Sequence, residues 1–295
     1  EVYKGVAPVE LGSDALGGSV NIVTNKSLDN YLDVSHSYGS FQTHQSALTG
    51  QYVYKPAGLV IKGSTFFNYS KNNYLMKGVE IWDAEKYEYV LRDFRRFHDR
   101  YKSLMGQLEV GLVNKKWADV LFLGLGYTTY DKQVQTGVRQ SIVYGGVIKD
   151  GTGKNVSLRY KKDSLLNNRL SIGLYGTYSY DEYVLSDTTL RKYSWDGSYV
   201  TGNPETGSLR LTQVNRPRIF TRFNGNYHLA ENHDLNINYT FDQVENQTYN
   251  RLTSSGDEMP GKLGKHIVGA AYQWKLLEDW THTFMGKYYG IAMNK

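Results

Sequence analysis

The clearest pattern in this chain is an alternation of apolar and polar residues with a period of two. In Leu235–Asp242 every odd-numbered residue is apolar or aromatic, and every even-numbered residue is polar. Such alternation is typical of β-strands that have one apolar face and one polar face. Eleven segments of this kind span residues 30–39, 44–55, 59–72, 101–114, 118–134, 154–164, 168–187, 216–229, 234–249, 264–277 and 280–293.

The connections between these segments alternate between short and long. Every second connection is a short turn, such as Lys55–Gly58, whereas those between are long and polar, and we expect them to be irregular. Only the short connection at Gly39–Phe41 departs from this order. A systematic turn side and loop side is typical of outer-membrane barrels, and most segments have the roughly 9–11 residues that a tilted spanning strand needs. The sequence therefore predicts an all-β, transmembrane antiparallel β-barrel rather than a soluble sandwich. The long connections are 73–100, 135–153, 188–215 and 250–263.

The composition agrees with a barrel. Tyrosine accounts for 26 of the 295 residues, and tyrosine is enriched where membrane proteins meet the water interface. The mean hydropathy of −0.52 excludes a bundle of membrane helices, and no apolar run approaches the roughly 18 residues of a spanning helix. The chain has no cysteine, so it has neither a disulfide framework nor a thiol nucleophile. Its net charge of +5 is too modest to identify a partner.

The first 26 residues do not follow the barrel pattern. Two short strands are expected, Glu1–Lys4 and Ser19–Thr24, with the glycine-rich segment Leu11–Gly18 between them. A phosphate-binding loop would end in Gly-Lys-Ser/Thr before a helix, and this segment does not. Its order and spacing resemble the end of the plug domain of TonB-dependent outer-membrane receptors, nearest to the siderophore and cobalamin type. The structural residues of the resembling motif are Gly12, Ser13, Gly17, Gly18 and Asn21.

The resemblance implies a domain organisation and a function. Residues 1–26 would be the end of the plug, and residues 27–295 the N-terminal half of a barrel with about 22 strands, so that the chain is a fragment. The implied function is active import of a scarce chelate, such as a ferric siderophore or cobalamin, across the outer membrane of a Gram-negative cell. Neither an enzymatic activity nor a cofactor is implied. The implied partners are the inner-membrane TonB complex, contacted outside this chain, a small chelate and outer-membrane lipid or lipopolysaccharide, but not nucleic acid. A glycan receptor that works with a surface lipoprotein is the alternative.

One loop contains candidate ligand-binding residues. Guanidinium groups suit carboxylates and phosphates, so four arginines in the loop 73–100 are candidates to bind an anionic chelate. The alternative is a solvated loop, with one helical turn, in which these arginines pair with Asp93 and Asp99 or contact lipopolysaccharide. The four candidates are Arg92, Arg95, Arg96 and Arg100.

Other constellations predict no chemistry. The segment Lys149–Lys154 resembles half of a calcium loop but lacks further acidic ligands, so we expect a turn there. The seven histidines are scattered without metal-ligand spacing, five of them in predicted strands and His233 in a turn. We therefore expect no metal site, and no triad or carboxylate pair indicates a catalytic site.

Overall fold

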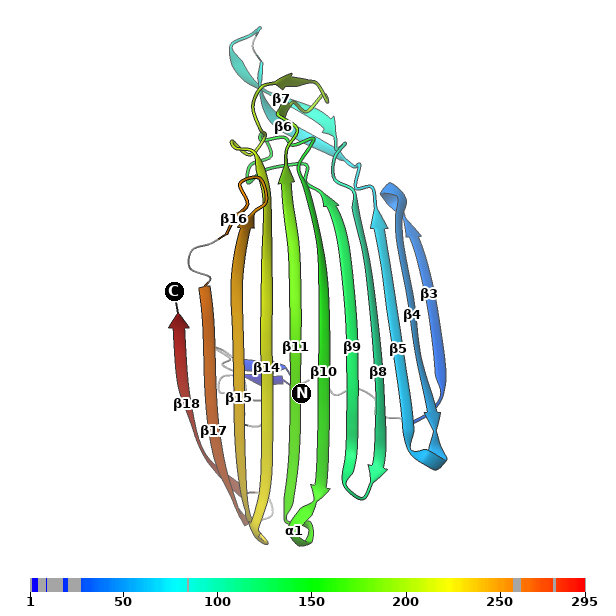
Figure 1. The fold of residues 1–295 in the computed structure, drawn as a ribbon, viewed down its shortest axis with the longest axis vertical. Coiled ribbons are helices and arrows are strands. Elements are labelled where there is room, and N and C mark those ends of the chain that lie inside the picture. Colours follow the sequence, from blue (N-terminus) through cyan, green and yellow to red (C-terminus); the bar gives the residue numbers. More distant parts are fainter. Residues whose placement is uncertain are drawn as a thin grey trace.

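A single antiparallel sheet forms a curved wall (Figure 1). The computed structural model describes residues 2–4, 9, 18–20, 28–83, 85–256, 261–277 and 280–294. Each long strand pairs with the next long strand along the chain, in the order β18-β17-β15-β14-β11-β10-β9-β8-β5-β4-β3. These strands are β3 (Tyr31–Gly39), β4 (Thr43–Tyr54), β5 (Leu59–Ser70), β8 (Tyr101–Lys115), β9 (Ala118–Gln133), β10 (Ile148–Ser164), β11 (Leu170–Asp187), β14 (Arg210–Ala230), β15 (His233–Asn250), β17 (Gly261–Leu277) and β18 (Trp280–Asn294).

The predicted alternation of turns and loops is confirmed. The short connections gather at one end of the wall, here called the turn end, and include η3 (Lys55–Ala57) and α1 (Leu165–Asn168). The long connections gather at the opposite end, here called the loop end (Figure 1). The short connection η2 (Ser40–Gln42) also lies at the loop end, as expected. The loop 73–100, which contains the candidate ligand-binding arginines, therefore lies at the loop end together with the other long connections.

The expectation that the long connections are irregular was wrong for three of the four. The second, residues 134–147, is irregular apart from one isolated bridge between Thr136 and Val143. The first contains a hairpin of β6 (Leu75–Asp83) and β7 (Glu88–Arg95), so the helical turn of the alternative interpretation is absent there and the segment forms strands. The third contains β12 (Arg191–Tyr193) paired with β13 (Tyr199–Thr201). The last contains β16 (Ser255–Gly256), which extends the wall beside β15. These strands are short and lack a long alternating pattern, because much of their burial comes from contacts between loops.

Two wall strands begin earlier than the sequence predicts. β10 starts at Ile148 rather than at residue 154, so the turn expected at Lys149–Lys154 was wrong. A Cβ built at Gly151 would lie 2.7 Å from the Tyr130 ring, which shows that this glycine makes room for a neighbouring side chain in a strand. β14 starts at Arg210 rather than at residue 216, because its pairing with β11 continues to Asp187. His233, expected in a turn, is the first residue of β15.

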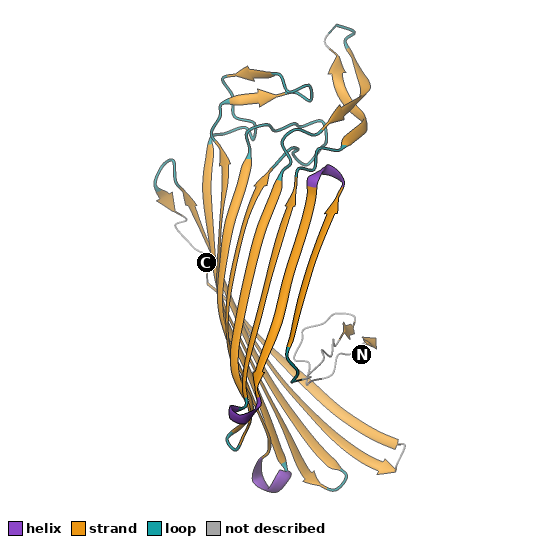
Figure 2. Ribbon diagram, turned by 90° about the vertical axis from the view of Figure 1, so that its right-hand side faces the viewer, coloured by secondary structure: helices purple, strands orange, loops and turns teal. Residues whose placement is uncertain are grey.

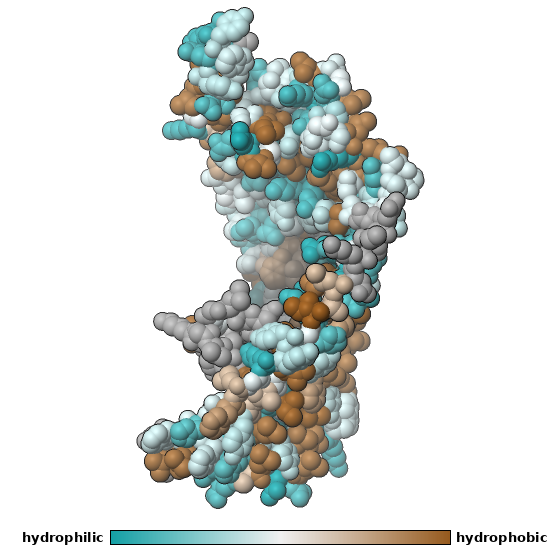
Figure 3. All heavy atoms as spheres, turned by 90° about the vertical axis from the view of Figure 1, so that its left-hand side faces the viewer, coloured by the Kyte–Doolittle hydropathy of each residue, from teal (hydrophilic) through white to brown (hydrophobic). Residues whose placement is uncertain are grey.

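The outward face of the wall is apolar and exposed. Residues such as Leu125, Ile237 and Val268 alternate with inward polar residues, and a band of hydrophobic residues covers the lower half of the wall (Figure 3). Rings gather near both ends of this face, as in the aromatic girdles of outer-membrane barrels. Stacked or tilted rings at the turn end belong to His233, Tyr272, Trp274, Trp280 and His282, and those at the loop end to Tyr38, His44 and Tyr69. A further group, Tyr239, Phe241 and His266, lies near the middle of β15 and β17.

Two short strands near the amino terminus lie on the concave side of the wall (Figure 2). β1 (Val2–Lys4) pairs with β2 (Gly18–Val20), which confirms two short strands where the sequence predicts them. Val9 is buried, and a Cβ built at Gly269 of β17 would lie 2.7 Å from its Cγ1. Asn238 and Thr240 on the neighbouring β15 are buried as well. Val9 therefore covers part of the inner face of the wall at β17.

Candidate functional site

Three long connections pack together at the loop end into a unit with its own small core. We call this unit the loop cap; it consists of residues 73–83, 85–100, 134–147 and 188–209. Met76 and Val79 of β6 are buried against Val143 of the second connection and Trp195 of the third. The Trp195 ring stacks on Phe94 of β7, with 5.9 Å between ring centroids. Burial of these side chains stabilises one arrangement of the three loops relative to one another.

A fully buried glutamine joins the first connection to the second. Gln135 is only 1% exposed. Its Oε1 accepts hydrogen bonds from the backbone N–H groups of Phe97 and His98, at 2.7 Å each, and its Nε2 donates to the Tyr144 carbonyl at 2.9 Å. His98 Nε2 lies 2.8 Å from the Val147 carbonyl oxygen. Because buried backbone groups need partners, Gln135 fixes the end of the first connection.

A carboxylate joins the second connection to the third. Glu205 accepts hydrogen bonds from the N–H groups of Gly145 and Gly146, one on each carboxylate oxygen and both at 2.7 Å. Trp195 Nε1 donates to the Gln140 carbonyl at 3.0 Å. The loop cap is therefore held by polar contacts as well as by its core, so its outer surface is presented in a defined shape.

Two of the four candidate arginines lie on β7 and are exposed. The Arg92 side chain is 57% exposed, and its guanidinium lies 2.8 Å from an Asp83 carboxylate oxygen across the hairpin. Arg95 donates to the Asn73 carbonyl at 2.7 Å. The Asp83 side chain is only 9% exposed, but its carboxylate also accepts hydrogen bonds from the N–H groups of Glu85 and Lys86. An ion pair whose guanidinium is solvated contributes about 0–1 kcal/mol. Both side chains can therefore exchange these contacts for a ligand at little cost in stability.

The other two candidate arginines, Arg96 and Arg100, lie at the base of the loop cap, where the first connection leads into β8. Arg96 Nε lies 2.9 Å from the Asp99 carboxylate, with both side chains largely buried, and its guanidinium lies over the Tyr74 ring. This ion pair with Asp99 is one that the alternative interpretation of the loop predicted. Arg100 pairs with Asp131 of β9 at 2.6 Å. The four guanidinium groups each have separate partners and do not converge on one point, and their role in ligand binding stays a prediction.

The outward face of the β6–β7 hairpin carries exposed aromatic side chains that the sequence did not single out. Trp82 and Tyr89 are paired across the hairpin with edge-to-face rings, and they are 53% and 66% exposed. Tyr87 at the hairpin tip is 80% exposed. The opposite face of the hairpin packs on the core of the loop cap through Val79 and Ile81. The aromatic face therefore points away from the molecule.

Of the predicted plug-motif residues, only Gly18 is described. It begins β2 and pairs with Lys4 of β1. The remaining motif residues, Gly12, Ser13, Gly17 and Asn21, lie outside the described residues.

The described residues contain no group of three or more histidine, aspartate or glutamate side chains that could hold a metal ion. Among the same residues, no helix is long and apolar enough to cross a membrane.

No family model and no curated protein matches the sequence. Among solved structures, the copper transporter OprC matches over 94% of this chain, with 15% identity and a TM-score of 0.63. The siderophore receptor PiuA from Acinetobacter baumannii matches over 99%, with 10% identity and a TM-score of 0.58. The ferric-catecholate import receptor Fiu from E. coli K12, in its open form, matches over 96%, with 12% identity and a TM-score of 0.62.

The match covers 40% of the OprC chain, 50% of the PiuA chain and 48% of the Fiu chain, so this chain spans half of their length or less. At these identities the comparison concerns the fold, and the matched fold is a part of a barrel wall. The chain therefore has the fold of the TonB-dependent outer-membrane receptors.

Proposed function

We propose that this chain takes part in TonB-energised import of a scarce metal chelate, such as a ferric siderophore, across an outer membrane. The observation that carries this proposal is the contact of Val9 with Gly269 on the concave side of an apolar-faced wall. A passive pore needs an open lumen, whereas here Val9 lies against the inner face of the wall, as expected for a plug inside a barrel. The names of the matched structures, two iron-chelate receptors and a copper transporter, support a metal-bearing cargo.

The outward face supports location in an outer membrane. Its exposed apolar band, with rings at both ends, fits hydrocarbon between two interfaces. Within the described residues, β3 and β18 each pair on one side only. Unpaired backbone groups at a sheet edge are not tolerated in hydrocarbon. We therefore propose that both edges are paired in the membrane, so that the wall is part of a closed barrel.

The loop cap supports a role in capture of the cargo. Its exposed arginines, Arg92 and Arg95, suit the carboxylates or phenolates of an anionic chelate, and its core holds them in place. Arg96 and Arg100 support that surface from below. The partners of the proposal are the inner-membrane TonB complex, which would supply the energy, and lipid or lipopolysaccharide along the outward face.

Uptake measurements test the proposal. The gene that encodes the chain is deleted, and accumulation of radioactive iron is measured with a set of ferric siderophores, alongside growth on cobalamin and on oligosaccharides as the only sources. We expect loss of uptake of one ferric chelate, and the same loss when TonB is inactivated. Loss of growth on an oligosaccharide alone would overturn the chelate proposal and favour the glycan alternative. Unchanged uptake after TonB inactivation would overturn the proposed energy source.

A further inference from the structure

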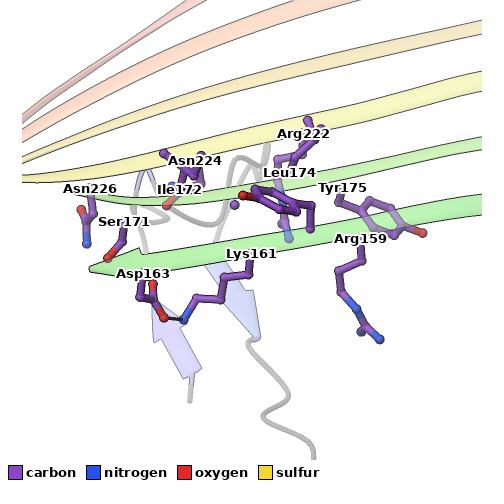
Figure 4. Close-up of a pocket in the computed structure, with 12 residues that line it drawn as sticks. Arg159, Lys161, Asp163, Ser171, Ile172, Leu174, Tyr175, Arg222, Asn224 and Asn226 are labelled. Carbon is purple, nitrogen blue, oxygen red and sulfur yellow. Dashed lines mark hydrogen bonds and ion pairs between the residues drawn. The ribbon is translucent and has the colours of Figure 1, made fainter. Parts of the chain in front are cut away.

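A hollow of about 540 Å³ lies on the concave side of the wall, nearer to the turn end than to the loop cap. Three neighbouring strands, β10, β11 and β14, form its floor (Figure 4). We call it the wall hollow. The polar side chains that define it are Arg159, Lys161, Asp163, Tyr175, Arg222 and Asn224.

The strand register explains why these side chains meet. Arg159 of β10 is the direct partner of Tyr175 of β11, and Tyr175 is the direct partner of Arg222 of β14. Paired residues project from the same face of a sheet. Lys161 and Asn224 lie two residues farther along their strands, on the same face. Five side chains from three strands thus surround one space.

The charges of the wall hollow are unbalanced. Arg159 lies 3.5 Å from the Glu109 carboxylate, a long ion pair, and its guanidinium is also over the Phe122 ring. Lys161 is paired more closely, at 2.5 Å, with Asp163. The Arg222 side chain has no hydrogen bond or ion pair with any residue that the structure describes, although its backbone pairs with β11 and β15. Three cationic groups therefore share two carboxylates, and the surplus charge is that of Arg222.

The surroundings of Arg222 favour an oxygen-rich ligand. Asn224 and Asn226 continue the same face toward the turn end, and Asn236 Nδ2 donates to Asn226 Oδ1 at 3.0 Å. Tyr175 of the adjacent β11 contributes a phenol ring, whose centroid lies 6.1 Å from that of the Phe220 ring of β14. A planar guanidinium beside amides and a phenol can bind an oxyanion with two parallel hydrogen bonds.

The wall hollow is open, whereas the wall beside it is covered. Asn238 and Thr240 of β15 are buried under the region where Val9 contacts β17, but Arg222 on the adjacent β14 is exposed. None of the amino-terminal residues that the structure describes lines the wall hollow. An exposed guanidinium that has no side-chain partner among the described residues can bind an incoming anion.

We propose that the wall hollow is an oxyanion-binding subsite, centred on Arg222, for cargo that bears carboxylate or phosphate groups. The subsite rests on the proposed import function and deepens it, because it assigns an anionic cargo a stopping point along the wall below the loop cap. Arg159 and Lys161 add charge to the subsite, and Asn224 donates to the bound oxygens.

Protection of arginines from chemical modification tests the subsite. The full chain in detergent is treated with phenylglyoxal, which reacts with accessible arginines, and the adducts are located by mass spectrometry. Citrate and inorganic phosphate serve as separate probes. We expect one or both to protect Arg222 and Arg159, while Arg169 at the turn end reacts as before. The probe that protects at the lower concentration identifies carboxylate or phosphate as the preferred chemistry. Equal protection of Arg169, or no protection of Arg222, would overturn the subsite.

Variants separate Arg222 from its neighbours. In Arg222→Gln, we expect the citrate or phosphate concentration that protects Arg159 to rise about tenfold, the equivalent of about 1.4 kcal/mol. Arg222→Lys keeps the charge and should retain part of the protection, which also shows that residue 222 tolerates substitution. Arg169→Gln is the matched control and should change nothing. Undiminished protection of Arg159 in Arg222→Gln would overturn the central role of Arg222.

The outcome also remains separate from the import function. If neither probe protects Arg222 but TonB-dependent uptake is found, only the subsite proposal is wrong. If a probe protects Arg222 but the deletion strain shows no uptake defect, only the proposed import function is wrong.

Discussion

Val9 contacts Gly269, although 260 residues separate them along the chain. A Cβ built at residue 269 would lie 3.6 Å from the Val9 Cβ. The contact joins the amino-terminal segment to the tenth of the eleven long strands, far from the strand that this segment leads into. The segment therefore reaches across the concave side instead of remaining beside β3.

This contact predicts a disulfide. A Cβ separation of 3.6 Å falls within the roughly 3.5–4.5 Å range of natural disulfides, and the chain has no cysteine that would interfere. The double variant Val9→Cys/Gly269→Cys should therefore cross-link on mild oxidation, as seen by non-reducing electrophoresis after a single proteolytic cut between the two positions. The control pair is Val9→Cys/Gly173→Cys, because Gly173 also lies on the concave face but has nothing within 4 Å of a built Cβ. Equal cross-linking of the two pairs would contradict the contact.

Replacement of Gln135, the buried glutamine of the loop cap, should cause a large local loss of stability. Gln135→Leu keeps the buried volume but leaves the N–H groups of Phe97 and His98 without acceptors, at a cost of about 1–3 kcal/mol each. Hydrogen exchange at these two amides should accelerate by at least about tenfold, since about 1.4 kcal/mol corresponds to a factor of ten. Gln140→Leu is the matched control, because Gln140 contributes only its backbone carbonyl. Unchanged exchange in Gln135→Leu would show that water replaces the side chain without cost.

The Glu205 carboxylate predicts a charge-dependent link between the second and third connections. Glu205→Gln retains an acceptor for one of the two glycine amides but places an NH₂ group near the other, so one charge-assisted bond becomes a donor–donor clash. Limited proteolysis within residues 188–209 should become faster, while cleavage elsewhere should not change. Glu231→Gln, in the short turn between β14 and β15, is the control. If the cleavage rates are the same in the two variants, the carboxylate does not hold the loops.

Sequence reasoning located the wall because the wall has a strict physical period. Each long strand must present one face to apolar surroundings and one to a polar interior, so apolar and polar residues alternate for its whole length. The same reasoning failed at Gly151, where a glycine reads as a turn residue but serves to accommodate the Tyr130 ring. It also failed for the β6–β7 hairpin, which is stabilised by contacts with residues of other loops.

The candidate site was only partly predictable for a related reason. The arginines of the first connection stand out by their number, but the partners of Arg100 and of the His98 amide lie 31 and 37 residues away. The sequence did not predict a role for Arg159 and Arg222 of the wall hollow, because each is a single charged residue within an ordinary alternating strand. Only the register that places Tyr175 between them shows that they share a space.

The turn between β12 and β13 predicts a pH dependence. The Ser198 hydroxyl and the Ser198 backbone N–H both donate to Asp196, at 2.6 Å and 2.9 Å, and hold the pKa of that carboxyl below its ordinary 3.8. Because the folded pKa is the lower one, this contribution to the turn is present above pH 3.8 and is lost as the pH falls through the folded pKa. Ser198→Ala should raise the pKa of Asp196 toward 3.8 in a carboxyl ¹³C titration. Ser194→Ala, in the same turn, should not. A pKa for Asp196 that is the same in both variants would contradict the hydrogen-bond origin.

The exposed and buried arginines of the loop cap predict opposite outcomes. In Arg92→Gln, an ion pair with a solvated guanidinium is lost, at about 0–1 kcal/mol, and Asp83 keeps its hydrogen bonds from the Glu85 and Lys86 N–H groups. Loop-cap stability should therefore be nearly unchanged while uptake of an anionic ferric chelate falls. In Arg96→Gln, the Asp99 carboxylate loses a largely buried partner, and the loop cap should open. Hydrogen exchange of residues 73–100 measures the second effect, and radioactive iron uptake measures the first. Arg169→Gln controls for loss of one positive charge. If Arg92→Gln and Arg169→Gln take up every tested chelate equally well, Arg92 has no part in cargo capture, and the exposed aromatic face of Trp82 and Tyr89 becomes the next region to test.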